Sequence, residues 1–491
     1  MASQDRIKHV VVLMLENRSF DHYFGFFKPA TGQKIENLQG TNAGLSNLLD
    51  PSKNASANNP SFPVSKPAPF AVHDTDGPSH SFNSVCVQLC NDRSGPSAQH
   101  PVKNNGFVRS YRDNLLQRTP NVGKDVIAEV MASFTPQQLP ALNALASNFC
   151  LCDHWFCEVP GPTMPNRMFI HAATSEGYVH NDFKRPYKSK TVYELFEKKQ
   201  LSWAVYFHDL NEVLQFKKLK KTDETFRRFD ERWAGDVAAG KLPAYSFILP
   251  RFLNKGGKRA NSQHAPEDVR FGEHLIADVY DALAANAGLF RETALVVTYD
   301  EHGGFYDHVA PGKAPNPDGI NSPNPDDTAD FKLPAFSFDR LGLRVPTIIV
   351  SPWIRKGIVE NRPLQHTSVI KTVTEMFNLA GPLNKRDASA ASFADLFQQT
   401  TAPRAASDMP AKLPRPSLAN ARVSREAAGQ PVEPADEPLN SLTREWVEGM
   451  MALTAGTAAR GRSRSASRGT PATHAEAAEL VEERLKSTFG I

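Results

Sequence analysis

The stretch Ile7-Lys-His-Val-Val-Val-Leu-Met-Leu15 is one of two apolar runs that decide the fold. Its residues are mostly branched and apolar, which is typical of a strand buried on both faces. The run Thr293-Ala-Leu-Val-Val-Thr-Tyr299 has the same character, and polar residues follow each run at once: Glu16-Asn17-Arg18 and Asp300-Glu301-His302. In open α/β sheets the ligand site lies outside the carboxyl ends of the strands. We therefore expect these two polar groups to meet at one edge of a sheet.

A third stretch, Glu158-Val-Pro-Gly-Pro-Thr163-Met-Pro-Asn-Arg167, carries a hydroxyl between prolines. The prolines and the glycine restrict the backbone and place Thr163 at the start of a helix, where N–H groups and the helix dipole favour an anion. Thr163 is thus a candidate nucleophile for a phosphate ester, although it could serve only as a helix N-cap in a proline-rich turn. Together, the three stretches indicate a metal-assisted site for phosphoryl chemistry.

Three segments of the chain resemble the signatures of the phosphoesterase family. They are residues 16–25 (ENRSFDHYFG), 160–167 (PGPTMPNR) and 299–308 (YDEHGGFYDH), and they occur in the family's order. The family contains bacterial and plant non-specific phospholipases C and the AcpA-type acid phosphatases. The resemblance covers roughly residues 5–400 and says little about the tail.

The resemblance implies an alkaline-phosphatase-like α/β fold, with a largely parallel central sheet and helices on both faces. Alternating strand-like and helix-like segments along the chain agree with this fold. We expect further strands at 149–156, 202–207, 245–249 and 344–352, and helices at 168–174, 191–199, 269–286 and 367–379. Segment 122–148 shows helical spacing with Thr135 as an internal N-cap, and 33–69 is predicted to be a surface loop.

The resemblance also implies the site residues. One divalent ion would be bound by Glu16, Asn17, Thr163, Asp300 and Glu301. Oxygen ligands favour Ca²⁺ first, with Mg²⁺, Mn²⁺ or Zn²⁺ as alternatives. The phosphate would contact four histidines, and the last three of these are candidates for protonating the leaving oxygen: His73, His80, His264 and His302.

Several of these residues have a plainer interpretation. His73 and His80 could belong to a solvated charge cluster in a turn, and His264 could be an ordinary loop histidine. His366 has either a role in the site or a place in a helix cap. Asp307 and His308 either hold the Gly303-Gly304 loop or take part in the chemistry.

The expected reaction is that of a phospholipase C. Thr163 would attack phosphorus in line, an alcohol such as diacylglycerol would leave, and water would hydrolyse the phosphothreonine. A choline headgroup would call for an aromatic cage, for which Trp155, Tyr178 and Tyr306 are candidates. The alternatives are an AcpA-type phosphomonoesterase and a non-catalytic protein that binds phosphate or lipid.

Length and charge limit the partners. The 491 residues are enough for a catalytic domain at 1–400 and a tail at 401–491, with an irregular strap and helices at 442–453 and 475–485. The formal charge of +3 comes from nearly balanced counts, so we expect no nucleic acid as a partner. The expected partners are a phospholipid or phosphate-ester substrate and, transiently, a membrane surface. The Arg/Ser-rich run 458–469 is interpreted as a solvated segment rather than an RNA site. The sequence does not indicate an oligomeric state.

The five cysteines do not have the spacing of a zinc site. We expect reduced, buried thiols, with a Cys86–Cys90 bridge as the minor alternative. No leader sequence precedes Glu16, and no apolar run is long enough for a bilayer. The chain is therefore expected to be cytoplasmic, or exported without a cleavable signal.

Overall fold

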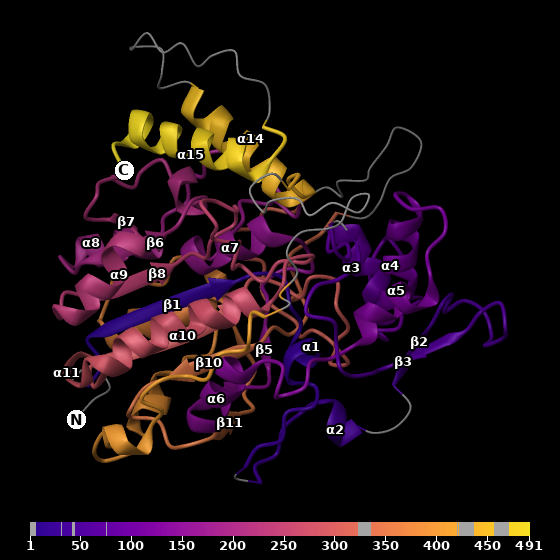
Figure 1. The fold of residues 1–491 in the computed structure, drawn as a ribbon, viewed down its shortest axis with the longest axis horizontal. Helices are drawn as coiled ribbons and strands as arrows, with labels where there is room; N and C mark the ends of the chain where they lie inside the picture. Colours follow the sequence, from indigo (N-terminus) through magenta and orange to yellow (C-terminus); the bar gives the residue numbers. More distant parts are fainter. Residues whose placement is uncertain are drawn as a thin grey trace.

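The computed structural model describes residues 6–30, 32–41, 45–74, 76–322, 335–419, 421, 437–455 and 471–491. Its centre is an eight-stranded sheet in the order β11-β4-β10-β9-β1-β8-β6-β7 (Figure 1). The strands are β1 (His9–Leu15), β4 (Cys150–Cys152), β6 (Trp203–Phe207), β7 (Phe226–Arg228), β8 (Tyr245–Ile248), β9 (Thr293–Tyr299), β10 (Thr347–Val350) and β11 (Ile358–Glu360).

The two apolar runs form the middle of this sheet. β1 and β9 pair in parallel from His9↔Thr293 to Leu15↔Tyr299, so both strands end at the same level. Residues from Val10 to Leu15 are at most 1% exposed, as expected for a strand covered on both faces. Every neighbouring pair is parallel except those of β10, which runs antiparallel to β4 and β9. The prediction of a largely parallel sheet is confirmed.

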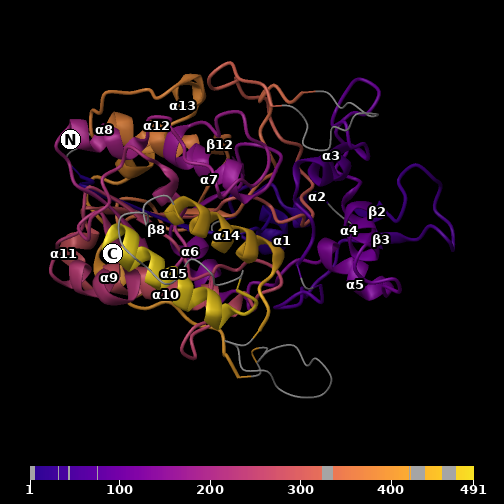
Figure 2. The same cartoon turned by 90° about the horizontal axis from the view of Figure 1, so that it is seen from above.

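Helices cover both faces of the sheet (Figure 2). One face carries α6 (Pro140–Asn148), α9 (Phe229–Ala238), α10 (Arg270–Ala285) and α11 (Ala287–Phe290). The other carries α7 (Thr163–Ala172), α8 (Val192–Lys198), α12 (Thr367–Met376) and α13 (Lys385–Ser389). The predicted α/β fold with helices on both faces is therefore present.

A smaller lobe lies beside the carboxyl edge of the sheet and has its own apolar cluster, which includes Val85, Leu89, Phe107 and Val108 (Figure 1). It contains α3 (Phe82–Cys90), α4 (Phe107–Leu116), α5 (Lys124–Ala128) and the hairpin of β2 (Ser46–Leu48) with β3 (Ser61–Pro63). The short helices α1 (Phe20–Phe24) and α2 (Leu38–Thr41) connect it to β1. Segment 33–69 is thus more ordered than the predicted loop.

Three local predictions are wrong. The strand expected at 149–156 is two strands, since the turn at Asp153 separates β4 from β5 (Trp155–Phe156), which pairs with β12 (Leu364–Gln365). Thr135 does not cap a helix: its N–H donates to the Gln138 side chain, and α6 begins at Pro140. α7 begins at Thr163 rather than at residue 168, because Pro165 fits a first helical turn, where no N–H is needed.

Two helices near the carboxyl terminus, α14 (Ser441–Ala455) and α15 (His474–Phe489), pack on the rest of the structure. Trp446 of α14 lies against Phe183 and Phe252, with ring centres 5.1 and 4.5 Å apart. The Arg/Ser-rich run 458–469 lies outside the described residues, and the division of the chain at residue 400 stays a prediction. No described helix has both the length and the hydropathy needed to cross a bilayer. All five cysteines are free and buried, as predicted.

Candidate active site

A buried arginine joins the ends of the central strands. Arg167 of α7 is fully buried and forms ion pairs with Glu16 (2.9 Å), Glu212 (3.1 Å) and Asp300 (3.1 Å), which follow β1, β6 and β9. Burial alone would lower the pKa of Arg167, but the charges of Glu16, Glu212 and Asp300 raise it above the usual value. Arg167 therefore stays charged and holds two of the predicted metal ligands in place.

Asp300 is fixed on every side. Its Oδ1 accepts hydrogen bonds from the backbone N–H groups of Asn17 (3.0 Å) and Glu301 (2.8 Å), while Oδ2 accepts from Arg167. Asn17 adopts a left-handed conformation with φ 57°, and a Cβ on Gly303 would lie 2.1 Å from its carbonyl oxygen. Gly303, at φ 66°, is thus required for the close approach of the two loops. The predicted meeting of these polar groups is confirmed.

Five buried oxygens in this region have no hydrogen-bond partner among the described residues. They are both carboxylate oxygens of Glu16, Oδ1 of Asn17, Oγ of Thr163 and Oε1 of Glu301, although Oε1 of Glu16 does form the ion pair with Arg167. Buried polar atoms are normally paired, because leaving one unpaired costs free energy. Burial raises the pKa of Glu16 well above its usual value. Burial and the nearby Asp300 raise that of Glu301 to about 8, against the effect of His80. All five are oxygens, the ligand type that a hard divalent cation prefers, but the carboxylates of Glu16, Asp300 and Glu301 do not place three ligand atoms within 4.8 Å of one another in the described structure.

Thr163 is presented by a rigid turn. It is the first residue of α7, and Pro162 is the N-cap, so the alternative in which Thr163 is the N-cap is wrong. The Asn166 side chain donates to the carbonyls of Val159, Gly161 and Pro162 and fixes the preceding loop. The first turn of α7 offers fewer free backbone N–H groups for an anion than the sequence suggested. The backbone N–H of Met164 donates to the Asn181 side chain, and Pro165 has no N–H.

Two of the predicted histidines line a cavity of about 360 Å³ next to Pro162. His80 donates from Nδ1 to the Pro78 carbonyl (3.0 Å), so its Nε2 accepts from the Asn17 side chain (3.1 Å) and lies 3.7 Å from Glu301. His264 is 4% exposed, and neither of its ring nitrogens has a hydrogen-bond partner among the described residues. The ring centres of His80 and His264 are 5.9 Å apart, so both imidazoles can face one ligand.

The other two predicted histidines have different surroundings. His302 is fully buried, contacts Gln88 through Nε2 (2.7 Å) and is not part of the cavity wall. Burial lowers the pKa of His302 to about 3, so the imidazole is neutral near pH 7, and its one ring proton is donated from Nε2 to the Gln88 side-chain oxygen. The side chain of His73 is 59% exposed, and its imidazole pairs with Glu129. The structure does not bring His73 to Thr163, and its predicted contact with phosphate has no support in this geometry.

His366 is the N-cap residue of α12, but its side chain makes no capping hydrogen bond and contacts the backbone of the site instead. Its Nε2 donates to the Asp300 carbonyl (2.7 Å), and its Nδ1 accepts from Trp155 (3.1 Å). The indole N–H of Trp155 is therefore used in the hydrogen bond to His366. Tyr306 packs against Phe107 in the smaller lobe, and Tyr178 carries the guanidinium of Arg185 on its ring. The three aromatic residues proposed for a choline cage do not meet.

A second charged group lies around Arg344. The ligand atoms of Asp21, Asp307 and His308 all lie within 4.8 Å of one another, which is compatible with a divalent ion. Arg344, however, already pairs with Asp21 (3.0 Å) and Asp307 (2.9 Å), and His308 pairs with Asp21 (2.5 Å). Asp307 and His308 thus hold the chain after Gly303-Gly304, the first of the two roles considered for them.

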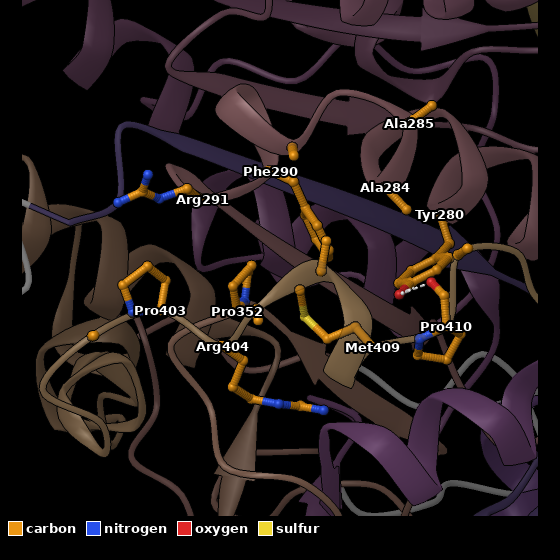
Figure 3. Close-up of a pocket in the computed structure, with 15 residues that line it drawn as sticks. Tyr280, Ala284, Ala285, Phe290, Arg291, Pro352, Pro403, Arg404, Met409 and Pro410 are labelled. Carbon is orange, nitrogen blue, oxygen red and sulfur yellow. Dashed lines mark hydrogen bonds between the residues drawn. The ribbon is translucent and has the colours of Figure 1, made fainter.

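A larger cavity, of about 510 Å³, lies away from these residues, between α10, α11 and the segment 402–411 (Figure 3). Its wall is mostly apolar and includes Ala284, Phe290 and Met409. Tyr280 donates to the Pro410 carbonyl, and Arg404 donates to backbone carbonyls, so neither polar side chain is free to bind a ligand. No residue of the three sequence motifs lines it.

Sequence reasoning missed two buried residues of the site. Arg167 lies four residues after Thr163 and so on the same side of α7, a spacing that could have identified it. Glu212 follows β6 in a segment of mixed polar and apolar residues, and no motif marks it. The cavity wall formed by Ser441, Leu442 and Glu445 of α14 was not expected either.

The model of the phosphoesterase family matches residues 7–380. Non-specific phospholipase C1 of Arabidopsis thaliana is 37% identical over 433 residues, which cover 84% of this chain and 75% of that protein. Phospholipase C B of Mycobacterium tuberculosis is 29% identical, over 81% of this chain and 78% of that protein. A solved structure from the alkaline phosphatase superfamily of Vibrio parahaemolyticus aligns with a TM-score of 0.30 and 10% identity, over 52% of this chain and 65% of that one. The family match does not depend on this distant likeness.

Proposed function

The chain belongs to the phosphoesterase family and is a phospholipase C-like phosphoric ester hydrolase, and from this premise we propose that it cleaves phospholipids to diacylglycerol and a phosphorylated headgroup. The observation that carries this proposal is the set of buried oxygens without a hydrogen-bond partner in the described structure on Glu16, Asn17, Thr163 and Glu301, together with a cavity next to Pro162 that His80 and His264 line. A hydroxyl, several carboxylates and two imidazoles are the groups that transfer of a phosphoryl group to a side chain requires.

A divalent ion fits the donor set, and Glu16, Asn17, Thr163, Asp300 and Glu301 would hold it. When bound, the ion would supply positive charge that stabilises a threonine alkoxide and neutralises the phosphate oxygens. Both oxygens of Asp300 already accept hydrogen bonds, so this residue would contribute a remaining lone pair. We place Ca²⁺ first among the candidates, because every donor is an oxygen.

The protein's own residues supply the other steps. The Thr163 hydroxyl loses its proton to solvent and Oγ attacks phosphorus; the bond from phosphorus to the diacylglycerol oxygen breaks, and that oxygen takes a proton from His80 or His264, which regains one from solvent. Water then hydrolyses the phosphothreonine, releases the phosphorylated headgroup and restores the hydroxyl. The two imidazoles differ in their surroundings: Nε2 of His80 accepts from the Asn17 side chain and would have to give up that bond to carry a proton to the leaving oxygen, whereas burial and the nearby His80 hold the pKa of His264 well below its usual value.

Substrate comparison tests the proposal. The purified protein should hydrolyse p-nitrophenyl phosphorylcholine faster than p-nitrophenyl phosphate, should release diacylglycerol from phospholipid vesicles, and should lose both activities on chelation. A preference for the monoester would favour a phosphatase of the AcpA type. Phosphate binding without turnover of any ester would indicate a non-catalytic protein.

A further inference from the structure

Two short segments near the active site carry an unusual density of positive charge. Segment 183–190 reads FKRPYKSK and segment 216–221 reads FKKLKK, and neither contains an acidic residue. We call their eight cations the basic platform: Lys184, Arg185, Lys188, Lys190, Lys217, Lys218, Lys220 and Lys221. Because the whole chain has a formal charge of only +3, this concentration of charge is local.

The two segments are joined to each other in space. Tyr187 and Phe216 form a parallel β-bridge, in which the N–H of Tyr187 donates to the Gln215 carbonyl (2.9 Å). The Gln215 side chain in turn donates to the Phe183 carbonyl (3.1 Å). The buried rings of Tyr187 and Phe216 hold the bridge in place, and the lysines on either side of it face solvent.

Most of this charge is not neutralised. Lys188, Lys190, Lys217, Lys218 and Lys220 are exposed, and no carboxylate of the described residues lies within ion-pair distance of them. The other three have partners, but weak or neutral ones. Lys184 and Arg185 each lie 3.7 Å from a glutamate, and the ammonium of Lys221 donates to backbone carbonyls. Five uncompensated lysines therefore form a surface that attracts anions.

One end of the basic platform adjoins the wall of the catalytic cavity, since Lys184 acts on the charge of Glu445, which lines that cavity. Asn181, three residues before Lys184, lines that cavity and accepts a hydrogen bond from Met164 next to Thr163. On the other segment, Glu212 precedes Lys217 by five residues and pairs with Arg167. Both segments thus begin a few residues after a residue of the site, and the second then runs back toward the start of β7.

We propose that the basic platform docks the enzyme onto anionic phospholipid bilayers and so brings the cavity mouth to its substrate. This inference rests on the proposed function, since a lipid substrate has to be reached at a membrane surface. Lysines near an anionic leaflet each strengthen partitioning about fivefold, and salt weakens the effect because the attraction is screened within a Debye length. A polyanion such as RNA could also match the charge, but only a bilayer explains its position at the mouth of a lipid site.

The test compares two triple variants of the full chain. K188Q/K217Q/K218Q removes three charges from the platform. K199Q/K241Q/K356Q removes three exposed lysines that precede the parallel strands β6, β8 and β11, at the opposite edge of the sheet. Binding to vesicles of phosphatidylcholine, with and without phosphatidylserine, is measured by co-sedimentation at low and high salt. Turnover of soluble p-nitrophenyl phosphorylcholine is measured in parallel.

The proposal predicts that the wild type binds the phosphatidylserine vesicles in a salt-sensitive manner. The platform variant should bind them at least about tenfold more weakly, the control variant should bind as the wild type does, and all three should turn over the soluble substrate equally. Equal weakening in both variants, binding that ignores phosphatidylserine, or RNA binding as tight as vesicle binding would overturn it. If the wild type does not hydrolyse the soluble substrate, the proposed function is refuted. Vesicle binding is a separate measurement and does not test that function.

Discussion

Replacing Arg167 by methionine should destabilise the whole protein, because it removes the only cation that the three buried carboxylates contact in the described structure. Glu16, Glu212 and Asp300 are 0% exposed and lie 2.9–3.1 Å from the guanidinium. Removing one partner of a buried ion pair costs about 3–5 kcal/mol. Since whole domains are stable by only about 5–15 kcal/mol, R167M should lose a large part of the free energy of unfolding.

The assay is urea unfolding followed by circular dichroism, with the slope checked against that of the wild type. R362M is the matched control: Arg362 also contacts two carboxylates, Glu360 and Asp395, but it is 43% exposed, so the loss should stay below about 1 kcal/mol. If R167M does not fold, R167K, which keeps the charge but not the fork of donors, should fall between the two. Equal unfolding midpoints for R167M and R362M would refute the idea that Arg167 holds the site together.

The remaining predictions concern catalysis and pH. Thr163→Ala should reduce turnover by at least about 10³-fold, and the melting temperature should change little because Oγ has no hydrogen-bond partner in the described structure. Thr163→Ser should keep part of the activity. Normal rates in the alanine variant would exclude Thr163 as the nucleophile. Gly303→Ala should lose activity and thermal stability, since its Cβ would meet the Asn17 carbonyl at 2.1 Å; an unchanged melting curve would contradict the close approach. Chelation should abolish hydrolysis, and added Ca²⁺ or another divalent ion should restore it. Burial alone would lower the pKa of His308, but the hydrogen bond and charge of Asp21 raise it from 6.5 to about 9. The contribution of His308 to the free energy of unfolding is therefore fully present below pH 6.5 and is lost as the pH rises through 9. His308→Gln should flatten the dependence of the unfolding free energy on pH in this range.

The central sheet was predictable from the sequence because its two middle strands are long, largely apolar runs. A run such as 7–15, mostly apolar and followed at once by Glu16 and Asn17, indicates both a buried strand and the edge of the sheet at which polar site residues are expected. The direction of β10 was not predictable, since a strand buried on both faces has the same composition whether it is parallel or antiparallel. The interruption of the strand at Asp153 was not predictable either, because it depends on tertiary pairing: β4 pairs within the central sheet, whereas β5 pairs with β12.

The candidate site was predictable where motifs carry it and not where tertiary packing does. Glu16, Thr163 and Asp300 follow from their motifs, and Arg167 brings the first and third of these together as expected. Glu212 comes from a segment that becomes part of the site only once β6 is placed in the sheet. The contact of His73 with phosphate was predicted from the residues around it in the sequence, but in the structure its imidazole pairs with Glu129.

The most direct measurement is anomalous X-ray diffraction from crystals of the protein grown with Mn²⁺. One ion should be found in contact with the side chains of Glu16, Asn17, Thr163 and Glu301, with Thr163 Oγ among its ligands. An ion bound at Asp21, Asp307 and His308 instead, or a Thr163 hydroxyl directed away from the ion, would contradict the proposed catalytic site.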